Sequence, residues 1–122
     1  MTAVTIYHNP KCSKSRQTLS LLEDNGVKPK IILYLETPPD AATLKDLLHQ
    51  LNVDIRDIIR TSEDAYTEQN LANDTLTEED LIAAILTAPK LLQRPILVCN
   101  DQARIGRPPE SVLDTIYTGC AS

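Results

Sequence analysis

The sequence predicts an α/β fold: a mixed sheet of about four strands, with a helical segment inserted between a β-α-β part and a β-β-α part. Two observations predict it. The chain begins with a β-rich run, a helical run and a second β-rich run, and two strands joined by one helix form a right-handed parallel unit. Two further β-rich runs and a last helical run come after a long stretch of helical periodicity.

The first 35 residues carry the β-α-β pattern. Val4–Tyr7 is short and β-rich, which predicts a strand. Ser13–Asn25 has leucines at helical spacing, and Gly26 suits the position just past the end of a helix. Lys30–Leu35 is a nearly continuous apolar run, which predicts a strand covered on both faces.

The middle of the chain is predicted to be helical throughout. A Pro-Pro-Asp start at residues 38–40 opens a helix with an apolar stripe. Two short helices are predicted at Ile55–Arg60 and Glu63–Gln69. Thr77 is followed by three acidic residues, a typical helix start, and Pro89 ends that helix. The stripe of the first helix consists of Leu44, Leu47, Leu48 and Leu51.

The C-terminal part predicts a hairpin and a helix. Pro95–Cys99 is strand-like, an Asn-Asp pair follows as a turn signal, and Ala103–Ile105 returns as the partner strand. The last helix begins at Pro108 and continues through Ile116. The chain has no linker, repeat or low-complexity tract, so residues 1–122 are predicted to form a single domain. The element order is that of a thioredoxin-like fold with inserted helices.

Charge and hydropathy exclude several classes of function. The net charge of −5 and the pI near 4.9 count against general binding of nucleic acid or of an anionic membrane. No apolar run approaches the ~20 residues of a membrane span, and the N-terminus lacks the layout of a signal peptide. We therefore expect a cytoplasmic protein whose anion site, if present, is local.

The three cysteines, Cys12, Cys99 and Cys120, are odd in number and widely spaced. This favours a reducing compartment over a disulfide framework. No C-x-x-C or paired Cys/His spacing suggests a metal site. Cys99 follows an apolar run and is predicted to be a buried strand residue, whereas Cys120 lies in a short tail.

Cys12 stands where the first strand ends and the first helix begins, among cationic residues. A free thiol has a pKa near about 8.5, which a helix N-terminus or nearby cations can lower by several units. The same arrangement attracts oxyanions. The alternative is that Cys12 is a small buried apolar residue beside solvated lysines. The neighbours that add positive potential are Lys11, Lys14, Arg16 and His8.

Three arginines are candidates for an oxyanion site, because a guanidinium offers forked donors that match a tetrahedral anion. Arg94 precedes Pro95, where a cis peptide bond could expose the arginine towards the site. Arg107 lies on a tight Gly-Arg-Pro-Pro turn, and Arg60 ends a middle helix. For any one of them alone, a surface or salt-bridged arginine is the better explanation, and spacing does not show that the three converge.

Four segments, HNPKCSKSRQTL, ILYLETPP, QRPILV and GRPPE, together resemble the glutaredoxin-coupled arsenate reductase family, over about residues 4–117. The resemblance implies a thioredoxin-like fold in which Cys12 is the nucleophile. It also implies that Pro95 is the cis proline of the fold, that His8 favours the thiolate and that Ser15 lies near the thiol. The residues implied to bind the oxyanion are Arg60, Arg94 and Arg107.

The resemblance also implies a reaction. Cys12 attacks arsenate, glutathione reduces the arsenic and forms a mixed adduct, and glutaredoxin takes over the glutathione and releases arsenite. No cofactor stays bound, and glutathione is a co-substrate. Cys120 could replace glutathione as a resolving thiol, although a merely exposed tail cysteine is the better explanation of its position.

Two other functions remain open. One is a regulator similar to Spx-type proteins, which bind RNA polymerase and usually carry C-x-x-C, where this chain has Ser15 at the second position. The other is a glutathione-linked thiol–disulfide oxidoreductase that does not act on arsenate. Such an enzyme could lose Arg60 with little effect, whereas an arsenate reductase could not.

Overall fold

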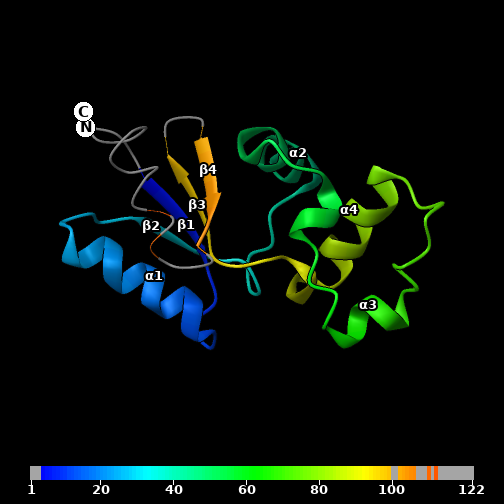
Figure 1. The fold of residues 1–122 in the computed structure, drawn as a ribbon, viewed down its shortest axis with the longest axis horizontal. Coiled ribbons are helices and arrows are strands. Elements are labelled where there is room, and N and C mark those ends of the chain that lie inside the picture. The colour runs from blue at the N-terminus through cyan, green and yellow to red at the C-terminus, as the bar shows by residue number, and fades with distance from the viewer. Residues whose placement is uncertain (1–3, 100–101, 107–109, 111, 113–122) are drawn as a thin grey trace. The chain divides into compact units, whose positions relative to one another are not determined.

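The computed structural model describes residues 4–99, 102–106, 110 and 112, and it divides into two compact units (Figure 1). Unit 1 consists of Met1–Thr37 and Arg94–Ser122, and unit 2 of Pro38–Gln93. Unit 2 coincides with the helical insertion that the sequence predicts. That the whole chain is one domain stays a prediction.

Unit 1 contains a four-stranded mixed sheet in the order β2-β1-β3-β4. Strand β1 pairs with β2 in parallel and with β3 in antiparallel, and β3 pairs with β4 in antiparallel. The predicted fold class is therefore confirmed. The predicted turn at Asn100–Asp101 and most of the predicted last helix lie outside the described residues. The elements of this unit are β1 (Val4–His8), α1 (Ser13–Asp24), β2 (Lys30–Leu33), β3 (Ile96–Cys99) and β4 (Gln102–Ile105).

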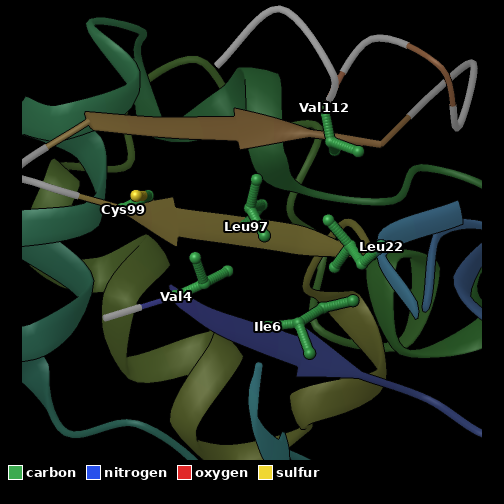
Figure 2. Packing of buried hydrophobic residues seen from close by; sticks show 6 residues of the cluster. All are labelled: Val4, Ile6, Leu22, Leu97, Cys99 and Val112. Atoms are coloured by element: carbon green, nitrogen blue, oxygen red, sulfur yellow. The ribbon is translucent and has the colours of Figure 1, made fainter. Parts of the chain in front are cut away.

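The core of unit 1 is built on one face of its two central strands (Figure 2). Val4 is paired with Cys99 and Ile6 with Leu97, so alternating residues of both strands point to the same side. Leu22 of α1 covers this face. The same cluster includes Val112, and Leu19 and Val27 pack at its margin.

Helix α1 ends as the sequence predicts. Gly26 adopts a φ of 77°, a left-handed conformation that favours glycine. Its N–H donates to the Glu23 carbonyl at 3.0 Å, and the Val27 N–H donates to the Leu22 carbonyl at 2.9 Å. These two bonds form a Schellman motif, which satisfies the last carbonyls of the helix.

Strand β2 differs from its prediction. It is an edge strand of the sheet rather than a strand covered on both faces, and Ile31 on it is 45% exposed. The strand also ends at Leu33, and the next residue, Tyr34, is completely buried. An apolar run alone does not distinguish an edge strand from a central one, because tertiary pairing sets the position of a strand in the sheet.

Unit 2 is made of short helices, three of which begin with a side-chain cap. Asp40 accepts the N–H of Thr43 at 2.8 Å at the start of α2. Thr77 and Asp80 form a capping box at the start of α4, which confirms the predicted helix start. The elements of this unit are α2 (Ala41–Leu51), the 3₁₀ helix η1 (Ile55–Ile58), α3 (Asp64–Glu68), α4 (Glu78–Thr87) and the 3₁₀ helix η2 (Pro89–Leu91).

Three residues of the α2 stripe, Leu44, Leu47 and Leu48, are buried, Leu51 is half-buried, and α2 packs against α4. The predicted helix from Ile55 to Arg60 is shorter, because Ile59 leaves it to form a β-bridge with Leu92. The fully buried side chains of this core include Leu44, Leu47, Ile55, Ile58, Leu81, Ile85 and Leu91.

Gly106 is a position of unit 1 where a side chain has no room. Its N–H donates to the Pro95 carbonyl at 2.9 Å. A Cβ there would lie 2.6 Å from the Thr18 Oγ1 and 2.8 Å from the Pro95 Cγ. We predict that Gly106→Ala lowers the free energy of unfolding by about 1–3 kcal/mol through overpacking, measured by urea denaturation.

A double-mutant cycle with Thr18→Ala tests the stated cause of this loss. Thr18→Ala removes the nearest obstructing atom, so the double variant should be more stable than the sum of the two single effects. Simple additivity would show that the clash with Thr18 does not cause the loss.

Candidate active site

The Ser15 hydroxyl links the end of β1 to the first turn of α1. Ser15 is completely buried. Its Oγ lies 2.7 Å from the His8 Nδ1 and accepts the backbone N–H of Asn9 at 3.0 Å. Because Ser15 is the third residue of the helix, these two contacts fix the direction in which α1 leaves the sheet.

Cys12 is the N-cap residue of α1. Its φ of −96° and ψ of 123° are extended, and its carbonyl accepts the N–H of Arg16 at 3.0 Å. Its own N–H donates to the Asn9 carbonyl at 3.0 Å. The first helical N–H groups lack intrahelical partners and carry the positive end of the helix dipole. The thiol is half-buried and is not in a disulfide.

His8 does not supply the positive charge that the sequence suggests. Burial lowers the pKa of His8 below its ordinary value of 6.5, and the nearby Arg16 lowers it further. The ring is therefore neutral near pH 7, and it supports the site through its contact with Ser15 rather than through charge. A neutral ring can satisfy this contact either by accepting the Ser15 O–H or by donating to the oxygen.

Arg16 has a partner of its own. Its Nη1 donates to the Pro10 carbonyl at 2.8 Å. Lys11 contributes through its backbone, donating its N–H to the Asn9 Oδ1 at 3.0 Å. The loop between β1 and α1 is thus held by hydrogen bonds on both sides of Cys12.

Strand register brings together three further residues, which we call the Asn9 row. The parallel pairing of β1 and β2 ends one residue before Asn9 and one before Tyr34, so these two lie side by side. The antiparallel pairing of β1 and β3 ends at Tyr7 and Ile96. Continued by two residues, this register sets Arg94 beside Asn9, on the side away from Tyr34. The peptide bond between Arg94 and Pro95 is cis.

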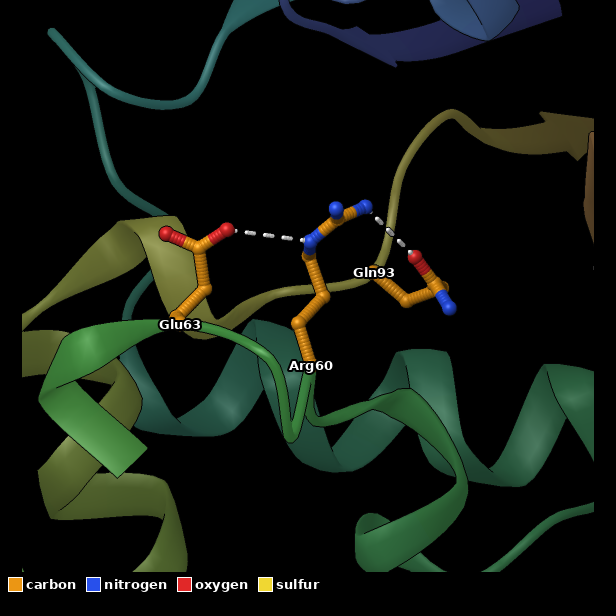
Figure 3. A network of polar contacts seen from close by, with 3 residues as sticks. All are labelled: Arg60, Glu63 and Gln93. Carbon is orange, nitrogen blue, oxygen red and sulfur yellow. Dashed lines mark hydrogen bonds and ion pairs between the residues drawn. The ribbon is translucent and has the colours of Figure 1, made fainter. Parts of the chain in front are cut away.

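Arg60 belongs to unit 2, where neighbouring side chains hold it (Figure 3). Its Nε donates to the Glu63 Oε2 at 3.3 Å, and its Nη1 donates to the Gln93 Oε1 at 3.1 Å. Its backbone N–H donates to the Leu91 carbonyl at 2.7 Å. Cys12 belongs to unit 1, so the convergence of Arg60 on the thiol stays a prediction.

Two predicted residues, Arg107 and Cys120, lie outside the described residues. Cys99 is buried in β3, as predicted, and it is disulfide-bonded, which the cysteine count did not predict. Cysteine number and spacing carry no information on which sulfur atoms the fold brings together. Within the described part of the chain, no group of three or more His, Cys, Asp or Glu residues is arranged to hold a metal ion. Among the described helices, none is long and apolar enough to cross a membrane.

Sequence reasoning missed three residues: Tyr34 in unit 1, and Glu63 and Gln93, which contact Arg60 in unit 2. The Arg60–Glu63 spacing of three residues was a readable signal for an ion pair. Gln93 is 33 positions away from its partner, so only the fold reveals it. Tyr34 looked like one more apolar strand residue.

The fold and the cysteine at a helix N-terminus define a thioredoxin-like protein with a single site thiol. The model of the ArsC family matches residues 7–115. An arsenate reductase of Neisseria meningitidis is 43% identical over 113 residues, 92% of this chain and 97% of that protein. The chain belongs to the ArsC family.

Two more relatives extend this result. The protein YfgD of Escherichia coli K12 is 59% identical over 114 residues, 93% of this chain and 96% of that protein. A solved structure of an arsenate reductase from Vibrio cholerae superposes with a TM-score of 0.91 at 53% identity, covering 93% of this chain and 97% of that one. Each of these two alignments spans nearly the full length of both chains compared.

The lowered pKa of His8 predicts how stability changes with pH. The unfolded chain binds the His8 proton more tightly than the fold does, so acid favours unfolding. The His8 contribution to stability is full above about pH 6.5 and is lost as the pH falls below that value. The free energy of unfolding, measured by denaturant titration at several pH values, should therefore fall less steeply with acid in His8→Gln than in the wild type.

His49→Gln is the matched control, because it changes the histidine of unit 2. Equal slopes for the wild type and His8→Gln would contradict the burial of a neutral His8.

Proposed function

We propose that the protein reduces arsenate to arsenite through Cys12, with glutathione and glutaredoxin as electron donors. The observation that carries this proposal is the position of Cys12 as the N-cap of α1, where unpaired N–H groups favour both a thiolate and a bound oxyanion. The arsenate reductases among its relatives support the choice of substrate.

The first step joins sulfur to arsenic. The Cys12 thiolate attacks the arsenic of arsenate, and one arsenate oxygen leaves as water. The arginines Arg60, Arg94 and Arg107 hold the remaining oxygens and stabilise the negative charge that builds up. His8 and Ser15 hold the loop that carries Cys12.

The following steps supply two electrons. Glutathione replaces a second oxygen on arsenic, and a glutaredoxin thiolate then attacks the glutathione sulfur. The mixed disulfide of glutathione and glutaredoxin leaves. Each of its two sulfur atoms has lost one electron, and arsenic has gained both, so that it falls from the +5 to the +3 state. Water replaces Cys12 on arsenic, which releases arsenite and returns the thiol.

A coupled assay tests this function. Purified protein, glutathione, glutaredoxin, glutathione reductase and NADPH are mixed, and arsenate is added last. We expect NADPH consumption that depends on arsenate, disappears in Cys12→Ser and falls by about 100-fold or more in kcat/KM in Arg60→Ala, since one lost oxyanion donor costs about that much.

Arg56→Ala is the matched control for Arg60→Ala. Arg56 lies in the same unit and donates to the carbonyls of Leu71 and Asn73 at 2.8 Å each, so its loss should lower stability and leave kcat unchanged. Turnover that survives Cys12→Ser would sink the mechanism. Reduction of hydroxyethyl disulfide without any response to arsenate or to Arg60→Ala would instead identify a thiol–disulfide oxidoreductase. If neither assay shows activity, a regulator similar to the Spx-type proteins is favoured.

The ion pair between Arg60 and Glu63 predicts that removing the Glu63 charge raises the affinity for arsenate. The Glu63 carboxylate competes with any oxyanion for the guanidinium, and both side chains are only about one-fifth exposed, at 20% and 22%. Glu63→Gln keeps the shape and removes the charge. The KM for arsenate should fall about two- to fivefold, the value of a partly exposed ion pair, with little change in kcat.

Glu68→Gln removes the same charge from an exposed position on α3 and serves as the control for long-range electrostatics. A higher KM in Glu63→Gln would show that Glu63 positions Arg60 for the substrate rather than competing with the substrate.

A further inference from the structure

The Tyr34 side chain is an unusual member of the core of unit 1. The residue has no exposed surface. Its hydroxyl is buried, and no hydrogen bond of good geometry reaches it in the part of the chain that the structure describes. A phenylalanine would fill the same space without burying a polar group, and a buried polar atom without a partner calls for an explanation.

Tyr34 lies at the edge of the sheet from which the Cys12 loop starts. It stands in the Asn9 row, directly after β2, and Asn9 receives the Cys12 N–H at 3.0 Å. Because β1 and β2 are parallel, Tyr34 and the loop that carries Cys12 lie at the same end of the sheet. In open α/β sheets this carboxyl end of the strands is where ligands and reacting groups lie.

The electrostatics of the hydroxyl agree with this placement. Burial raises the pKa of Tyr34. The charge of Arg94, and the Arg94 and Asn9 side chains, which lie within hydrogen-bonding reach of the hydroxyl although poorly aligned with it, pull the pKa partly back, and negative charge on Cys12 raises it again. The phenol thus stays protonated at neutral pH and is a neutral donor within the electrostatic reach of the thiol. A donor that is already in place lowers the energy of charge that appears beside it.

We propose that the Tyr34 hydroxyl stabilises the Cys12 thiolate by donating a hydrogen bond to its Sγ once that sulfur carries charge. No hydrogen bond of good geometry holds the hydroxyl in the described part of unit 1, and its burial shields it from water, which would otherwise compete for it. This inference rests on the proposed function only in using Cys12 as the nucleophile, and it holds for any electrophile that Cys12 attacks.

Other charged groups act on the same thiol and must stay constant in a test. His8 is neutral and acts through Ser15, Arg16 is bonded to the Pro10 carbonyl, and Arg94 flanks Asn9. Lys11 and Lys14 are exposed neighbours of the thiol. Tyr34→Phe changes none of these charges and keeps the ring that fills the core.

The experiment is alkylation of Cys12 by iodoacetamide across a range of pH, followed by mass spectrometry of the Cys12 peptide in the full chain. In Tyr34→Phe, the midpoint of the alkylation profile should rise by about one pH unit, equal to a tenfold loss of thiolate below the midpoint. Tyr66→Phe, which removes a half-buried hydroxyl in unit 2, should match the wild type. Thermal unfolding of Tyr34→Phe should be unchanged or should shift to higher temperature, because an unpaired hydroxyl is lost.

Each outcome decides one question. An unchanged profile in a folded Tyr34→Phe overturns the inference, and if arsenate then protects Cys12 less well than in the wild type, the hydroxyl serves the oxyanion instead. If the alkylation profile shifts in Tyr34→Phe but the wild type does not turn over arsenate, the inference is upheld and the proposed function is contradicted. A profile that shifts equally in Tyr66→Phe overturns it, because the effect is then not specific to the hydroxyl near Cys12.

Discussion

The candidate site depends on one buried hydroxyl, that of Ser15. Its oxygen binds the His8 ring and the Asn9 N–H at the same time, so it fastens the first turn of α1 to the end of β1. With that joint fixed, Cys12 must become the N-cap, since only three residues separate Asn9 from the start of the helix. The direction of the helix dipole and the position of the thiol are consequences of the same contact. An alanine at Ser15 would leave the Asn9 N–H and the His8 ring buried without this partner, which costs more than the loss of one hydrogen bond.

The site shows how an acidic chain can attract an anion without a basic surface. The net charge is −5, His8 is neutral, and Arg16 is bonded to a backbone carbonyl. Under the proposed function, the attraction comes mainly from the oriented N–H groups at the start of α1 and from the arginines that the proposal assigns to the oxyanion. Such dipoles act over one helical turn and are largely insensitive to the total charge of the chain. An acidic chain disfavours nonspecific polyanions, because a polyanion needs an extended positive surface, whereas the proposed function requires only a small oxyanion at the helix start.

The parts of the fold that the sequence predicts well are those set by local signals. Gly26 ends α1 because only a left-handed residue fits there, and Thr77 begins α4 because its hydroxyl caps the Asp80 N–H. The features that escaped prediction depend on register between distant segments. Ile31 faces solvent because β2 is an edge strand of the sheet. Tyr34, which follows β2, is buried beside Asn9. For the site, the sequence predicted Cys12 with His8 and Ser15 beside it, and it could not predict that the Gln93 side chain binds Arg60, because 33 positions separate the two.

Arg60 combines a rigid backbone with exchangeable side-chain partners. Its N–H donates to the Leu91 carbonyl and the Gln93 N–H donates to the Ile58 carbonyl, both at 2.7 Å, on either side of the β-bridge between Ile59 and Leu92. The guanidinium, in contrast, is held by an amide and a carboxylate at 3.1 and 3.3 Å, contacts at the long end of the range for such bonds. A tetrahedral oxyanion offers shorter, charge-assisted bonds to the same nitrogen atoms. The backbone therefore keeps the arginine in one place at no cost to ligand exchange, because the interactions that a ligand must replace are the weak ones. Under the proposed function, Arg60 must release these side-chain partners to bind the oxyanion, and a helical insertion with its own core holds its backbone in place while they exchange.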